Sequence, residues 1–286
     1  MREKDSWPQI ELAQENGDYK RMASLLLPLA DSGDVEAQYA LAGLCENGHG
    51  VRKSLKKAFT WYEKAALQGH ILAQYRMGDF YEDFATTLVR RNLAKAAEWY
   101  KLAAMQGNAK AQYCLGSLYY YGNGVEQSTV EAVKWYLKAA VQGLVDAQCS
   151  MGFVYSHGYG VPRDNAMAIY WYEKAAMQGN DYAQSHSADM FLRGIGTPRD
   201  YGKAYALYKI LANKGDANAM YNLGLVYEFG KGVVQSNKLA RYWYKKTLAL
   251  ERNPAYAQQA LQRLALREKG IVLYVGTIAE SSSQRE

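Results

Sequence analysis

The sequence has few of the residues that usually carry disulfide bonds, metal sites or catalysis. Its 286 residues include three cysteines, four histidines and five prolines. Three cysteines cannot form a dense disulfide framework, which indicates a reducing compartment. The longest nearly apolar runs, 24–30 and 271–275, are far shorter than the ~20 residues of a membrane-spanning helix. No apolar segment follows the charged first residues, so we expect a cytoplasmic protein, or a periplasmic one whose leader has been removed.

The overall composition is that of an ordinary folded protein with one unusual bias. Apolar residues make up 49% and charged residues 22% of the chain, which argues against disorder, and the formal net charge is +6. Tyrosine is the exception, because its 25 copies equal the 25 glycines and far outnumber the six phenylalanines. This bias arises from an internal repeat.

Six glycines recur 36 or 38 residues apart, and each begins one copy of the repeat. They are Gly33, Gly69, Gly107, Gly143, Gly179 and Gly215. Alanine follows four positions later, then glutamine in five copies, and a Trp-Tyr or Leu-Tyr pair comes further on. We number positions from this glycine, which is slot 0. The six predicted repeats are 33–68, 69–106, 107–142, 143–178, 179–214 and 215–252.

Each repeat is predicted to fold as two antiparallel helices. In the third repeat, apolar residues at helical spacing predict a first helix over 108–121 and a second over 129–142. Gly122 and Gly124 supply the left-handed conformation that ends a helix. One such pair cannot bury its apolar face alone, so stacked pairs are expected. The predicted fold is therefore all-α, a right-handed α-solenoid of stacked antiparallel helix pairs.

The ends of the array and two of its repeats depart from the pattern. A capping helix and half-repeat are predicted over 1–32, a C-terminal capping helix over 253–269 and a tail over 270–286. The second repeat has Phe-Ala-Thr-Thr at 84–87 where the others have Gly-x-Gly. The fifth has Ser187 in a core slot and Leu207 in place of tryptophan. We expect the loop at 82–92 and the packing at 185–208 to differ most from the other repeats.

The recurring elements A-Q-Y-x-L-G, G-x-G-V and W-Y-x-K-A-A-x-Q-G resemble Sel1-like repeats, a variant of tetratricopeptide repeats, over roughly residues 17–265. The resemblance is to the bacterial type and implies a non-enzymatic protein-interaction scaffold. Such proteins serve in protein quality control, bacterial signalling, surface polysaccharide regulation and host contact, and as immunity partners of secreted toxins. Our specific expectation is an immunity protein that inhibits a toxin, with an adaptor or regulator in signalling or host contact as the alternative. Cysteine-rich members carry a cysteine pair in every repeat, and this sequence does not.

No catalytic, cofactor or metal site is predicted. The sequence has no H-E-x-x-H or C-x-x-C motif and no P-loop spacing, and its Gly-x-Gly elements are helix terminators. His157 and His186 are expected to lie too far apart to share a metal ion. Cys45 and Cys149 occupy core slots, whereas Cys114 occupies a variable slot with no histidine placed beside it. A hydrolase acting on cell-wall material is the alternative from another class, and the lack of an acid/base pair disfavours it.

Four lysines recur at one position of the second helix and are expected to form a solvated ladder. They are Lys64, Lys138, Lys174 and Lys246. The ladder lacks the interleaved arginines and aromatic residues typical of nucleic-acid binding, so no nucleic-acid partner is expected.

Partner binding is predicted on the first helices. Slots 4, 8, 11 and 12 are mostly apolar and belong to the core, whereas slots 3, 7, 10 and 14 vary freely and lie within about 60° on a helical wheel. In tetratricopeptide-like arrays this face lines the concave groove, so we expect a protein partner there; the alternative is that these side chains cover neighbouring helices. The predicted residues are Arg76, Asp79, Lys110, Tyr121, Phe153, His157, Tyr182, His186, Asp189, Arg193, Asn222, Leu225 and Phe229. The β-prone run 271–275 is expected to pack on the last repeat, to add a strand to a partner or to fold back into the groove.

Overall fold

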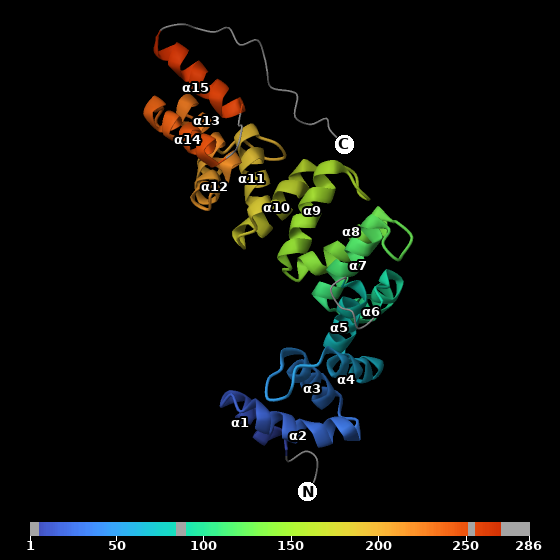
Figure 1. The fold of residues 1–286 in the computed structure, drawn as a ribbon. Helices are drawn as coiled ribbons and strands as arrows, with labels where there is room; N and C mark the ends of the chain where they lie inside the picture. The colour runs from blue at the N-terminus through green and yellow to red at the C-terminus, as the bar shows by residue number, and fades with distance from the viewer. Residues whose placement is uncertain (1–5, 84–89, 251–254, 270–286) are drawn as a thin grey trace. The chain divides into compact units, whose positions relative to one another are not determined.

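The computed structural model describes residues 6–83, 90–250 and 255–269, which form fifteen helices and no strand (Figure 1). The helices are α1 (Trp7–Glu15), α2 (Tyr19–Ser32), α3 (Val35–Asn47), α4 (Leu55–Leu67), α5 (Ile71–Glu82), α6 (Leu93–Met105), α7 (Ala109–Tyr121), α8 (Thr129–Val141), α9 (Val145–His157), α10 (Asn165–Met177), α11 (Asp181–Arg193), α12 (Tyr201–Asn213), α13 (Ala217–Phe229), α14 (Asn237–Leu250) and α15 (Ala255–Glu268). Odd-numbered helices from α3 to α13 are the first helices of the six repeats. The predicted all-α solenoid is confirmed. The segments 84–87, 253–254 and 271–275 lie outside the described residues.

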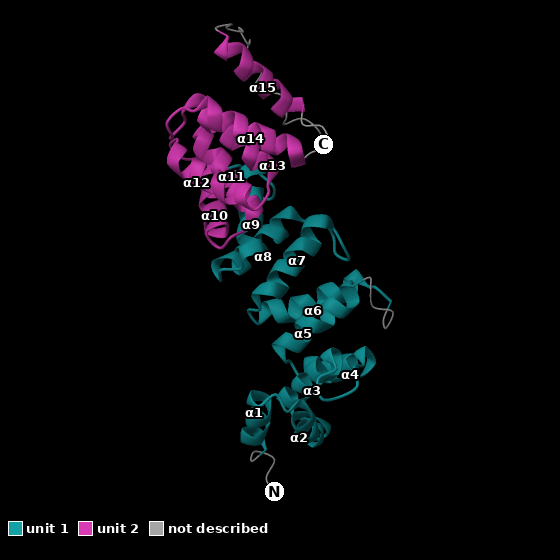
Figure 2. Ribbon diagram, turned by 60° about the vertical axis from the view of Figure 1, so that its left-hand side comes forward, with its two compact units in different colours: residues 1–163 teal, residues 164–286 magenta. Residues whose placement is uncertain are grey.

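The chain divides into two compact units (Figure 2). The N-terminal unit comprises residues 1–163 and contains α1 to α9, and the C-terminal unit comprises residues 164–286 and contains α10 to α15. The two helices of the fourth repeat, α9 and α10, therefore belong to different units. Within each unit every helix packs on the one that follows it.

Short polar residues and glycines set the helix boundaries, as the third repeat illustrates. Asn108 caps α7, because its side-chain oxygen accepts the backbone N–H of Ala111 at 2.8 Å. Gly122 ends the helix with a φ of 69°. Gly124 also has a positive φ, and a Cβ there would lie 2.3 Å from the carbonyl carbon of Leu93. The Gly-x-Gly element thus ends the first helix and lets the loop touch the preceding repeat.

The tyrosine of the Trp-Tyr pair fills the space between the two helices of a repeat. Tyr100 is fully buried, and its ring lies over Gly78, where an added Cβ would be 2.4 Å from the ring carbons. Gly224 meets Tyr244 in the same way, at 2.2 Å. The ring therefore requires a small residue at slot 9. The tyrosine hydroxyl emerges on the side of the first helix that carries slots 10 and 13.

A ladder of glutamine side chains joins successive repeats in the N-terminal unit. Gln74 donates its Nε2 to the carbonyl of Ala66 in the preceding helix at 3.2 Å. Its Oε1 accepts from Nε2 of Gln106, at the end of α6, at 2.8 Å. The same bonds recur from Gln68 to Gln38 at 2.9 Å and from Gln142 to Gln112 at 2.8 Å. These buried amides are paired on both sides, which explains why the repeat keeps glutamine at slot 5.

Candidate partner-binding surface

The thirteen predicted partner-binding residues lie at the surface of the first helices, and the structure buries none of them completely. The exposed ones are Lys110, Tyr121, His157, Tyr182, Arg193 and Phe229. The half-buried ones are Arg76, Asp79, Phe153, His186, Asp189, Asn222 and Leu225. We call these thirteen residues the first-helix surface and describe it separately in each unit.

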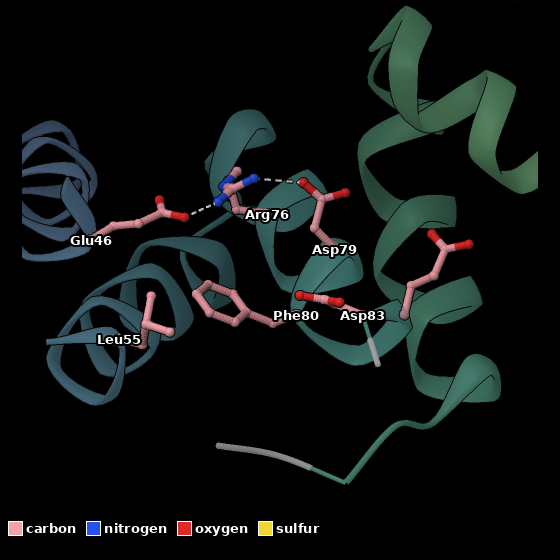
Figure 3. Close-up of a pocket in the computed structure, with 7 residues that line it drawn as sticks. Glu46, Leu55, Arg76, Asp79, Phe80 and Asp83 are labelled. Carbon is pink, nitrogen blue, oxygen red and sulfur yellow. Dashed lines mark hydrogen bonds and ion pairs between the residues drawn. The ribbon is translucent and has the colours of Figure 1, made fainter. Parts of the chain in front are cut away.

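In the N-terminal unit the surface begins with a charged cluster around Arg76 (Figure 3). The guanidinium of Arg76 pairs with Glu46 of α3 and, at 2.8 Å, with Asp79 one turn further along α5. The hydroxyl of Tyr100 donates to Asp79 at 2.9 Å and to Glu82 at 2.6 Å. Burial raises the pKa of the Asp79 carboxyl, and the hydrogen bond from Tyr100 and the charge of Arg76 offset the shift only in part.

This cluster lines a cavity of about 400 Å³. Its wall combines four carboxylates and one guanidinium with two apolar side chains. The wall residues are Glu46, Leu55, Arg76, Asp79, Phe80, Glu82 and Asp83. Because acidic groups outnumber the single arginine, the cavity is suited to a cationic group.

Aromatic rings gather on α7, on α9 and on the loop after α9. Tyr121 is 67% exposed and lies edge-on against Tyr120, with ring centroids 5.0 Å apart. Phe153 contacts His157, with ring centroids 4.4 Å apart, and the ring of His157 stacks on Tyr159 at 5.4 Å. We call Tyr120, Tyr121, Phe153, His157 and Tyr159 the aromatic cluster. It exposes apolar ring surface that no packing requirement of the repeat explains.

In the C-terminal unit, some first-helix surface residues of α11 contact the neighbouring helices α10 and α12. The ring of His186 stacks on Tyr172 of α10, with centroids 5.1 Å apart, and lies 4.2 Å from the ring of Tyr182. Asp189 accepts a hydrogen bond from the hydroxyl of Tyr208. Arg193, in the last turn, is exposed. Part of this face therefore supports the packing of α10 and α12.

The last helix, α15, covers the corresponding face of α13. Arg263 and Arg267 lie over the ring of Phe229 at 5.6 and 5.4 Å, and Leu225 packs against the cluster that contains Leu264. Beneath them Glu228 is completely buried. It accepts from Nη2 of Arg263 at 2.6 Å and from the hydroxyl of Tyr244 at 2.7 Å.

Burial and the contacts of Glu228 shift the pKa of its carboxyl in opposite directions. Burial raises the pKa of this carboxyl, but hydrogen bonds from Arg263 and Tyr244 and the charges of Arg263 and Arg267 outweigh burial and lower it below its ordinary value. Leu225 and Phe229 thus pack against the chain's own α15, the alternative that the sequence left open for such side chains.

The repeats match a known family over most of the chain. The model of the Sel1 repeat matches residues 35–70, 71–108, 109–144, 145–180, 181–216 and 217–250. The chain belongs to the Sel1 repeat family. A Sel1 repeat protein from Oxalobacter formigenes is 31% identical, with a TM-score of 0.73 over 85% of this chain and 99% of that one. A protective antigen of uropathogenic Escherichia coli with an SLR fold is 30% identical, with a TM-score of 0.57 over 86% of this chain. The chain spans 64% of the length of that antigen.

This membership, together with bacterial neighbours of the same fold, makes the chain a Sel1 repeat scaffold of the kind that typically mediates protein–protein interaction. An immunity protein from Pseudomonas aeruginosa also matches, at 18% identity and a TM-score of 0.40, values that carry no argument about function.

Several residues that complete the surface of this Sel1 repeat protein were not predicted from the sequence. Glu46, Glu82 and Glu228 all occupy slot 13, and each accepts a hydrogen bond from the tyrosine of its own repeat. Their recurrence at one slot in three repeats was a signal present in the sequence. Tyr159 and Arg263 are different, because they reach the surface from a loop and from the capping helix. Tyr159 is the variable residue of a Gly-x-Gly element, outside the variable slots of the first helix, and Arg263 lies beyond the six repeats.

The described residues provide no group of three or more histidine, cysteine, aspartate or glutamate side chains suited to a metal ion. All three cysteines are unpaired; Cys45 is buried as predicted, whereas Cys149 is half-buried. Burial, with the carboxylates of Glu82 and Asp79 nearby, raises the pKa of the Cys114 thiol to about 12. A thiol that holds its proton so firmly is unsuited to nucleophilic catalysis. Of the helices that the structure describes, none has the length and apolar character needed to cross a bilayer.

The expectation that the lysine ladder lacks interleaved aromatic residues is wrong, because its lysines stack on aromatic rings of the second helices. Lys64 and Lys138 each lie 4.1 Å from the ring centroid of the tryptophan one turn earlier, Trp61 and Trp135. Lys174 lies 5.0 Å from the ring of Tyr170 instead. These ammonium groups cover aromatic faces that would otherwise meet water, which gives the ladder a role in the packing of the second helices.

Proposed function

We propose that the chain is a non-catalytic scaffold that holds one protein partner on the first-helix surface of its N-terminal unit. The observation that carries the proposal is the aromatic cluster on α7 and α9, in which Tyr121 and Tyr159 stay exposed although the core of the repeat is complete without them. Aromatic side chains dominate the energy of protein interfaces because they bury much area at little entropic cost.

The acidic cavity indicates the chemistry of the partner. It lies between α3 and α5, two first helices that precede the aromatic cluster in the array. A lysine or arginine of the partner that enters the cavity would meet Glu46, Asp79 and Glu82 there. We therefore propose a partner surface that places a basic side chain next to an apolar or aromatic patch.

The same carboxylates support the proposal of a scaffold rather than a hydrolase. Asp79 and Glu82 share the hydroxyl of Tyr100, and Arg76 holds both Asp79 and Glu46. Each of these carboxylates is engaged by a structural partner within the repeats.

The specific form of the proposal is an immunity protein that inhibits a secreted bacterial toxin by binding it one to one. The resemblance suggests this role, and the open face of the first helices suits it, since stoichiometric inhibition requires a large complementary surface and no chemistry. A regulator of bacterial signalling or host contact would use the same surface, and the identity of the bound protein distinguishes the two.

The experiment compares two triple variants of a tagged chain in cells that express it. Replacing Tyr121, His157 and Tyr159 with serine should remove a protein that co-purifies one to one with the wild type. We expect a loss of about 2 kcal/mol or more, roughly thirtyfold in affinity.

The matched control replaces three exposed apolar residues of the second helices α4 and α8 with serine: Leu67, Val130 and Val141. It should retain the partner. Equal retention by both folded variants, or equal loss from both, would rule out the first-helix surface as the binding site.

A further inference from the structure

The fifth repeat lacks the tryptophan–lysine stack that three other repeats build on their second helices. The stacks are Trp61 with Lys64, Trp135 with Lys138 and Trp243 with Lys246, at nitrogen-to-centroid distances of 4.1, 4.1 and 5.4 Å. In the fifth repeat Leu207 and Ile210 stand at these two positions. The chain has thus lost an indole and its covering cation at one place in the array.

A cavity of about 360 Å³ lies at this place, between α10, α11 and α12 of the C-terminal unit. Its wall is mostly apolar and includes Ala176, Phe191, Leu207 and Ile210. A cavity of about 330 Å³ in the first repeat uses the equivalent core positions, but there Trp61 forms part of the wall and the cavity extends to the loop at 50–52. In the fifth repeat the cavity extends in the other direction, to Gly179 and Gln184. This volume is within the range of pockets that bind small organic groups.

Two buried polar atoms of residues that line the cavity have no hydrogen-bond partner among the described residues. They are Oε1 of Gln184, a residue only 5% exposed, and Oγ of Ser187, which is completely buried. In the first repeat the equivalent glutamine oxygen, on Gln38, accepts from Gln68. In the fifth repeat Lys214 replaces that donor and pairs with Asp181 instead. A buried acceptor without a donor is unfavourable, so a ligand that supplies an N–H is favoured here.

We propose that this cavity binds the indole of a tryptophan side chain from a partner protein. The repeat places an indole at this position elsewhere in the array, so the walls are already suited to a planar ring. The indole N–H would donate to Gln184 Oε1, which needs a donor. The charged groups that line the cavity, Lys203 and Glu173, pair with each other at 3.0 Å and leave no net charge for an ionic ligand.

The surroundings of the cavity favour a protein segment over free indole. Met177 and Ile210, which line it, are 85% and 43% exposed. Free indole would fill the cavity and leave this apolar surface in water, whereas residues flanking a tryptophan would cover it. The site lies between the second helices α10 and α12 and the first helix α11, and none of its lining residues belongs to the first-helix surface. Its variants and those of the aromatic cluster therefore test separate claims.

The test is calorimetric titration of the full chain with N-acetyl-tryptophanamide. We expect saturable binding that weakens about tenfold for the analogue methylated on the indole nitrogen, because the methyl group removes the donor. Leu207→Trp should fill the cavity, abolish binding and raise the thermal midpoint of unfolding. The control Leu67→Trp adds a tryptophan at an exposed position of α4 and should bind as the wild type does.

Three results would overturn the assignment: no saturable binding to the wild type, undiminished binding to a folded Leu207→Trp variant, or free indole that binds as tightly as the amide. If Leu207→Trp does not fold, the methyl resonance of Met177 in the wild type decides. A shift of that resonance on titration supports the site, and an unchanged resonance contradicts it.

Discussion

Replacing Glu228 with alanine is expected to cost about 3–5 kcal/mol of the stability of the C-terminal end of the array. The buried carboxylate joins three helices, because it lies on α13 and accepts hydrogen bonds from Tyr244 of α14 and Arg263 of α15. Its removal leaves a tyrosine hydroxyl and a half-buried guanidinium without their acceptor. Hydrogen exchange of the α15 amides should show the loss first, because in a repeat protein an end can open without the rest.

The control is Glu268→Ala, which removes a surface carboxylate of α15 that pairs with Arg241 of α14. We expect this variant to lose at most about 1 kcal/mol of stability, because the ion pair is exposed. The pH dependence supplies a second check. The pKa of Glu228 in the folded protein is below its ordinary value. The contribution of Glu228 to stability is therefore complete when the pH is above the ordinary value, and it is lost as the pH falls through the pKa of the folded protein. Glu228→Gln should remove this acid sensitivity of α15; a variant as acid-sensitive as the wild type would contradict the assignment.

Gly78→Ala is expected to destabilise the second repeat by about 1–3 kcal/mol, although alanine is the better helix former. The added Cβ would lie 2.4 Å from two carbons of the buried Tyr100 ring, so the ring or the helix must move. That movement would also shift the Tyr100 hydroxyl, which holds Asp79 and Glu82. Chemical denaturation gives the stability.

The matched control is Gly43→Ala, one slot further along α3. There the nearest atom to an added Cβ is the hydroxyl of Tyr62 at 3.7 Å, an ordinary contact. We expect this variant to gain up to about 1 kcal/mol from helix propensity. If both alanines changed stability in the same direction, the tyrosine ring would not be what sets the residue at slot 9.

The repeat made the helices predictable to within a residue or two. The expected helix over 108–121 is α7 with Asn108 as its cap, and the expected 129–142 is α8 with Gln142 just beyond its end. Capping residues and left-handed glycines are local signals, and six copies of them remove the ambiguity that a single copy would leave. The same repetition identified the slots that packing leaves variable.

The contacts on the first-helix surface could not be predicted in the same way. The hydroxyl of Tyr100 reaches two carboxylates only because its ring lies on Gly78, and a sequence does not show how far a side chain reaches. The arginines over Phe229 come from α15, which lies outside the repeat register. The cavity beside Leu207 is lined by residues from the three helices α10, α11 and α12, and a sequence does not show which residues of separate helices meet.

The division between fixed and variable slots explains how this chain can act as a scaffold. Core alanines, the slot 9 residue and the glutamine ladder hold the helices together, and they leave the exposed rings of the aromatic cluster free to be selected for a partner. Where the chain's own α15 covers the same face, the exposed ring of Phe229 is used for internal packing instead.

Site-specific photo-crosslinking tests the proposed binding surface most directly. A benzophenone amino acid placed at Tyr121 on α7 should crosslink one partner protein, whereas the same amino acid at Val141 on α8, which is 68% exposed, should not. The two positions are on the two helices of one repeat and are similarly accessible, so the comparison depends only on which face the partner covers. Crosslinks from Val141 alone, or equally from both positions, would contradict a partner bound to the first helices.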